Sequence, residues 1–179
     1  MNTFLGIALL IATVAKQLGL SLTVASSTYA LIFYFQSLRD GTVDDTEKRF
    51  LHTVFFVLRL GWALFAAGEI ILLAFIFSLG TPLSAVSDTI WMTWLIFGVL
   101  LLNAYLMTKH IMPMRFGPAL AGGSWYSIFF LNVLPFGNFH WSFLILGYVI
   151  FLAVFFGILE IIRKQVTTHN PQPTTNPNA

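Results

Sequence analysis

The sequence predicts an all-α fold: a polytopic transmembrane helical bundle of five spans, with the N-terminus outside and the C-terminus in the cytoplasm. Of the 179 residues, 58% are hydrophobic and only 9% are charged, whereas a soluble domain carries roughly 25% charged residues. The apolar residues also fall in long runs, as membrane spans require. The chain has no cysteine, which excludes disulfides and thiolate sites. A net charge of +2, dispersed along the chain, does not indicate a nucleic-acid partner.

Five apolar segments make up a transmembrane domain over residues 1–164. They cover approximately 3–38, 50–79, 89–107, 117–134 and 141–162. A helix crosses the ~30 Å hydrocarbon core with about 20 residues, which the third and fifth segments match. The first two are ~10–15 residues longer, so they must tilt, bend or project beyond the bilayer. The fourth is marginal in length, with Pro118 in its first turn and Pro135 at its end, and a re-entrant segment is the main alternative.

The distribution of lysine and arginine predicts the orientation. Most of the basic residues lie close to the ends of spans one, three and five: Arg39, Lys48, Arg49, Lys109, Arg115, Arg163 and Lys164. The connections after spans two and four contain no basic residue. By the positive-inside rule, the basic connections are cytoplasmic. Trp91, Trp94 and Trp141 then lie at the outer ends, where an aromatic belt is expected.

Two polar segments flank the predicted spans. In the cytoplasmic hairpin, Asp44 followed by Glu47 resembles a capping box, so the second helix should begin before the membrane does.

At the other end of the predicted domain, Glu160 lies one turn from the cytoplasmic end of span five, and its side chain can extend to the interface. The last segment, 165–179, is polar and rich in Pro, Thr and Asn, a composition that predicts disorder.

Three charged residues lie well inside the spans, where charges are rare and mark function or helix pairing. They are Lys16, Arg59 and Glu69. Counting helical rise from the hairpin places Lys16 and Glu69 at a similar depth near the outer boundary. The same count places Arg59 level with Ser26 to Tyr29, so that Ser26, Ser27 or Tyr29 would hydrogen-bond it. We therefore expect an intramembrane polar cluster of Lys16, Ser26, Arg59 and Glu69. The cluster either holds neighbouring helices together through polar contacts, or it is an ion or proton path in which Glu69 titrates.

Two histidines lie at the cytoplasmic ends of spans two and three. His52 and His110 are candidate ligands for a b-type haem or a metal near the inner face. The alternative is that they are interfacial histidines without a ligand role. No nucleophile elbow, zinc-protease motif or phosphate loop occurs in the sequence, so no catalytic residue is predicted.

Three short sequences carry a resemblance to known proteins: K-Q-L-G-L-S-L-T-V-A-S-S-T at 16–28, D-G-T-V-D-D-T-E at 40–47 and G-G-S-W-Y-S at 122–127. Over most of residues 3–164, the chain resembles a group of small, uncharacterised five-span bacterial integral membrane proteins. The resemblance implies a location in the bacterial inner (plasma) membrane and no particular activity. Where that group tends to carry glycines, this chain has Ala25, Ser26 and Ser27. A looser similarity to copper-resistance-type membrane proteins implies metal or haem handling, although methionine–histidine clusters are missing.

These features together favour a non-enzymatic structural or accessory component of a membrane assembly. Small residues on one face of span one and in Ala121–Ser124 of span four would pack against other helices. The expected partners are the lipid bilayer and either other membrane subunits or further copies of the chain. The haem or metal protein using His52 and His110, and the small ion or proton translocator using Lys16, Arg59 and Glu69, are the alternatives.

Overall fold

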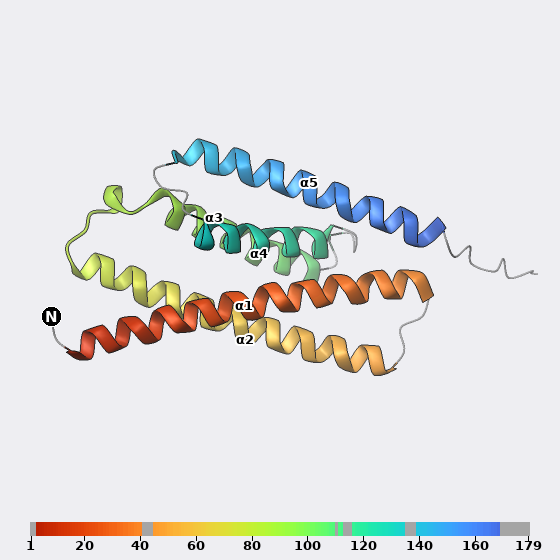
Figure 1. The fold of residues 1–179 in the computed structure, drawn as a ribbon, viewed down its shortest axis with the longest axis horizontal. Helices are drawn as coiled ribbons and strands as arrows, with labels where there is room; N and C mark the ends of the chain where they lie inside the picture. The colour runs from red at the N-terminus through yellow and green to blue at the C-terminus, as the bar shows by residue number, and fades with distance from the viewer. Residues whose placement is uncertain (1–2, 41–44, 110, 113–115, 135–138, 169–179) are drawn as a thin grey trace, which may run out of the picture.

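The computed structural model describes residues 3–40, 45–109, 111–112, 116–134 and 139–168. Over these residues the chain is all-helical, as predicted (Figure 1). The elements are α1 (Thr3–Asp40), α2 (Asp45–Ser78), the short 3-10 helix η1 (Leu83–Ala85), α3 (Asp88–Thr108), α4 (Gly117–Val133) and α5 (Trp141–Thr168). Four of them, α1, α2, α3 and α5, are long and apolar enough to cross a membrane. With 17 residues, α4 is shorter than these four.

The helices run back and forth between the two ends of an elongated bundle (Figure 1). At one end, here called the hairpin end, α1 finishes and α2 begins; α3 and α5 also finish there, and α4 begins there. The N-terminus lies at the opposite end. In the middle of the bundle, α4 packs against α1, α3 and α5. Among the described helices, in contrast, the backbone of α2 approaches α1 alone.

Two of the helices, α1 and α2, are as long as the sequence predicts, and a third, α5, is longer than the predicted span. At 38 and 34 residues, α1 and α2 are about 57 and 51 Å long, well beyond the ~30 Å hydrocarbon core. The start of α2 at Asp45 matches the predicted early start of the second helix. Helix α5 continues to Thr168, four residues past Lys164, because no proline or glycine interrupts it before Pro171. Residues 169–179 of the tail lie outside the described residues.

Glycines bring α1 and α2 into close contact. A Cβ atom at Gly19 of α1 would overlap the backbone of Phe65 and Gly61 in α2. A Cβ atom at Gly68 would lie 2.7 Å from the carbonyl oxygen of Ala12. Such positions have no room for a side chain, and small residues there let two membrane helices pack backbone to backbone. The predicted small-residue face of α1 is therefore buried against its neighbours.

Aromatic rings connect α2 to the other helices where the backbones do not approach. Trp62 stacks on Phe97 of α3 with ring centroids 5.1 Å apart. Phe65 lies 5.9 Å from Phe97 and 5.9 Å from Trp125 of α4, edge to face in the second case. Phe65 and Trp125 are almost fully buried. These rings are the centre of the hydrophobic core, and aromatic pairs of this geometry stabilise beyond their buried area.

The small residues of α4 are a helix-packing surface, as the sequence predicts. A Cβ atom at Gly122 would lie 3.0 Å from Leu31 of α1, and one at Gly123 would lie 2.7 Å from Leu152 of α5. Ser124 is fully buried between them. The central position of α4 thus depends on residues small enough to admit side chains from both sides.

Candidate functional site: an intramembrane ion pair

Lys16 of α1 and Glu69 of α2 form an ion pair inside the bundle, which confirms the pairing expected from helical depth. Lys16 Nζ lies 2.7 Å from Glu69 Oε1, and the two side chains are 17% and 7% exposed. The neighbouring Gly68 permits this geometry, because a Cβ there would lie 2.8 Å from the Lys16 Cβ. Both charges are compensated at short range. Removal of either partner would leave the other as a poorly solvated charge.

Side chains of α2 and α3 enclose the glutamate. The small space beside Glu69 is lined by Phe65, Ala66, Thr93, Trp94 and Phe97. The Thr93 hydroxyl donates to the Thr89 carbonyl of its own helix at 2.9 Å and not to the glutamate. The Trp94 Nε1 is buried and has no hydrogen-bond partner within the described part of the chain. Over the described residues, Lys16 is therefore the charged group that meets Glu69.

An open, apolar groove lies next to this site, between α2 and α3. Its volume is about 420 Å³. Its lining combines aliphatic and aromatic side chains: Ile70, Leu73, Ala74, Phe77, Trp91 and Trp94. Trp94 thus separates the groove from the space beside Glu69. The groove brings no polar side chain into contact with the ion pair.

The structure does not join Arg59 to the predicted cluster. Arg59 is exposed, whereas Ser26 and Ser27 are buried, and no hydrogen bond or ion pair to Arg59 occurs among the described residues. Tyr29, the third predicted partner, is 57% exposed. The physical reason is rotation about the axis of α2: Gly61 faces α1, and Arg59 is two residues earlier, about 160° around the helix at 100° per residue. The expected contact between Arg59 and Ser26 is therefore wrong.

Within the described residues, three side-chain hydrogen bonds join α4 to its neighbouring helices. They join Thr28 Oγ1 to Tyr126 OH at 2.7 Å, Ser124 Oγ to Tyr148 OH at 2.9 Å, and Asn103 Nδ2 to the Gly117 carbonyl at 3.0 Å. None of these three contacts was predicted from the sequence. Their signal is a hydroxyl or amide placed in the middle of an apolar span, where it needs a partner in a neighbouring helix.

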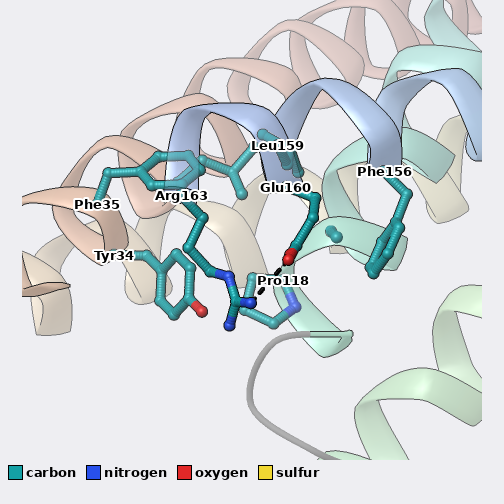
Figure 2. A pocket seen from close by; sticks show the side chains of 9 residues that line it. Tyr34, Phe35, Pro118, Phe156, Leu159, Glu160 and Arg163 are labelled. Carbon is teal, nitrogen blue, oxygen red and sulfur yellow. Dashed lines mark hydrogen bonds and ion pairs between the residues drawn. The ribbon is translucent and has the colours of Figure 1, made fainter. Parts of the chain in front are cut away.

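A second ion pair lies in a small pocket at the hairpin end (Figure 2). Arg163 donates to Glu160 at 2.7 Å, one turn apart on α5, and each side chain is 30% exposed. Figure 2 shows both side chains directed toward Pro118 of α4, with Tyr34 of α1 beside the guanidinium. Partial exposure and the local i,i+3 spacing make this a weaker contact than the pair between α1 and α2.

Asp88 joins the starts of two helices. Ser87 accepts a hydrogen bond from the Thr89 amide and is the N-cap of α3. The Asp88 carboxylate accepts one from the amide of Trp141, the first residue of α5, at 3.0 Å. A carboxylate at a helix N-terminus satisfies a free amide and interacts favourably with the helix dipole. Asp88 is thus a capping residue that ties α5 to α3.

Of the two histidines of the haem hypothesis, His52 is the one that lies within the described residues. His52 is exposed on α2, and His110 lies outside the described residues. No group of three or more His, Asp or Glu side chains that would hold a metal ion occurs in the described part of the chain. Haem or metal binding by His52 and His110 stays a prediction from the sequence.

Comparisons of the chain with protein-family models, with curated proteins and with solved structures each find no match.

Proposed function

We propose that the chain is a non-enzymatic structural or accessory component of a membrane assembly, located in a bacterial inner membrane. In this proposal it crosses the bilayer five times, with the N-terminus outside and the hairpin end in the cytoplasm. The presence of Lys48, Arg49, Lys109 and Lys164 at the hairpin end supports this orientation. The position of α4 in the middle of the bundle, packed against α1, α3 and α5, supports the fifth crossing.

The observation that carries the proposal is how little of α2 the rest of the chain covers. Its backbone has α1 as its neighbour, and its hairpin half leaves Phe55, Phe56, Arg59 and Leu60 exposed. Inside the bundle, by contrast, polar groups such as Lys16 and Glu69 are already engaged with one another. The interior therefore serves helix packing, and the uncovered side of α2 is available for another protein.

The test is the state of the native protein in a mild detergent. We expect it to purify as a particle clearly heavier than one 20.0 kDa chain plus its detergent micelle, with other subunits in constant ratio. Chemical cross-linking before solubilisation should give the same subunits. A monodisperse particle that contains a single chain, obtained in several mild detergents, would contradict the proposal.

The Lys16–Glu69 pair favours one second candidate, a small ion or proton translocator in which Glu69 exchanges the proton. Carboxylates inside membrane bundles mark ion pathways and proton relays. The measurement is ion or proton flux in liposomes that contain the purified chain. Flux that E69Q abolishes would support translocation, and liposomes no leakier than protein-free ones would contradict it.

A further inference from the structure

Arg59 lies at mid-membrane depth if α2 spans the bilayer. Trp62 stacks on Phe97, so these two residues are at the same level. Arg59 is three residues before Trp62, which places it ~4.5 Å nearer the hairpin end, level with Leu100 of α3. Because α3 spans Asp88–Thr108, that level is ~18 Å from one end of α3 and ~12 Å from the other.

The arginine cannot reach the interface on its own. Its side chain extends toward the N-terminus of α2, and hence toward the hairpin end, by ~6 Å, which is about half of the distance required. It is exposed, so no other part of the described chain shields it. Charged side chains at this depth generally face protein or water and pair with an opposite charge or with backbone carbonyls, so the position of Arg59 favours an anionic partner.

Among the described residues, no carboxylate is paired with Arg59. The seven acidic residues of the chain are Asp40, Asp44, Asp45, Glu47, Glu69, Asp88 and Glu160. The first four belong to the hairpin, and Glu47, the nearest of them in sequence, is ~18 Å from Arg59 along the helix. Glu69 and Glu160 are paired with Lys16 and Arg163, and Asp88 caps α5 at the opposite end.

The surface around Arg59 has the composition of a helix-packing face and not of a lipid-facing one. Residues at successive steps of four and three, the spacing of a helix–helix seam, share this exposed side of α2: His52, Phe56, Arg59 and Ala63. The next two positions in this spacing, Ala66 and Ile70, lie beside α3. Lipid-facing surfaces consist mainly of large apolar side chains, whereas Phe56 is the one large apolar side chain of this seam. A second copy does not satisfy it, because a symmetric contact would place the same acid-free surface against itself.

We infer that this seam binds a transmembrane helix of a different protein, whose aspartate or glutamate pairs with Arg59 near the middle of the membrane. The inference rests on the proposed function and specifies its partner: a heterologous membrane subunit with an intramembrane carboxylate. A bidentate guanidinium–carboxylate contact in a medium without water provides both affinity and register.

The absence of cysteine from the chain makes the experiment direct. Ala63→Cys places one thiol on the seam, and Val154→Cys on an exposed part of α5 is the matched control. The full chain is labelled with a benzophenone maleimide in native membranes and irradiated, and cross-linked peptides are identified by mass spectrometry. Each thiol variant is also combined with Arg59→Leu and with Arg59→Lys.

We expect the Ala63 site to cross-link to a membrane span of another protein that carries an aspartate or glutamate within about one turn of the adduct. Arg59→Leu should lower the yield of this adduct at least tenfold, and Arg59→Lys should keep it within about threefold, because the charge is retained. The Val154 adducts should not change. An adduct with lipid alone, with a second copy, or with a span that lacks a carboxylate would overturn the inference, as would a yield that Arg59→Leu leaves unchanged.

These outcomes separate the inference from the proposed function. If the heavy particle persists but the yield of the Ala63 adduct does not depend on Arg59, the proposed assembly is supported and the inferred carboxylate partner is refuted. If the native protein is a single-chain particle and neither site cross-links to protein, both statements fail.

Discussion

Breaking the Lys16–Glu69 pair should cost much more than replacing it. At the observed 2.7 Å, two unit charges attract by about 6 kcal/mol for an effective dielectric constant of 20. Desolvation has already offset part of that attraction, so the measurable penalty is the cost of leaving one charge alone. We expect Glu69→Gln or Lys16→Met to lower the free energy of unfolding by about 3–5 kcal/mol. Glu69→Gln should be at the low end, because the amide oxygen still accepts a hydrogen bond from the ammonium.

The double variant distinguishes an ion pair from two independent sites. Lys16→Met combined with Glu69→Leu removes both charges and keeps similar volumes, so its stability should be within about 1–2 kcal/mol of the unmodified chain. The coupling energy of this cycle is then several kcal/mol. The charge-exchanged pair, K16E with E69K, should likewise recover part of what either reversal loses.

Unfolding in mixed micelles of dodecyl maltoside and sodium dodecyl sulfate provides the assay, with fluorescence of the five tryptophans and helicity as probes. Glu160→Gln is the matched control, because Glu160 and Arg163 are each 30% exposed and such a pair contributes at most about 1 kcal/mol. The reasoning is refuted if both single variants lose less than about 1 kcal/mol, or if the double variant loses as much as the two singles together.

Three further predictions concern packing, hydrogen bonding and cofactor binding. Gly19→Ala should lower the free energy of unfolding by about 1–2 kcal/mol, because the added methyl group overlaps the backbone of α2. Gly98 has open space around it, so Gly98→Ala should be neutral or gain up to about 1 kcal/mol from helix propensity. The same micelle assay compares the two variants, and equal effects would argue against the close α1–α2 contact. Tyr148→Phe should lower the free energy of unfolding by about 0.5–1.5 kcal/mol, because it removes the hydrogen bond to buried Ser124. Tyr29→Phe, at an exposed position, should change it by no more than about 0.5 kcal/mol. A larger effect at Tyr29 than at Tyr148 would contradict the stabilising role of the Ser124–Tyr148 hydrogen bond. The haem hypothesis predicts a Soret band in the gently purified protein that disappears in His52→Ala, and a colourless protein would rule that hypothesis out.

Sequence periodicity predicted the contacts that depend on distance along a helix. Lys16 and Glu69 meet because equal numbers of residues separate them from the hairpin, and rise per residue is nearly constant. The close packing of Gly122 and Gly123 in α4 follows from their size, whatever their neighbours are. In both cases a property of one helix or one residue, the rise per residue or the size of glycine, was sufficient to predict the contact.

Contacts that depend on rotation about a helix axis were not predictable in the same way. Arg59 and Glu69 of the second span were both expected to meet polar residues of the first span. The α1-facing side of α2 is set by Gly61 and Gly68, and a straight helix drifts ~20° per heptad from a fixed stripe. Arg59 therefore turns outward, while Glu69 stays buried. The hydrogen bonds of Tyr126 and Tyr148 were likewise not predictable, because the sequence does not say which helices surround α4.

The distance in sequence between Lys16 and Glu69 also has a consequence for biosynthesis. At ~5–20 residues per second, the ribosome needs roughly 3–10 s to make the chain from one to the other. During that interval α1 has been synthesised and its ammonium has no carboxylate to meet, so the first segment alone inserts with a penalty. Insertion should become favourable only when α2 emerges and the two segments enter as a helical hairpin, with the charge already neutralised. The pair thus links the membrane integration of the first span to the synthesis of the second.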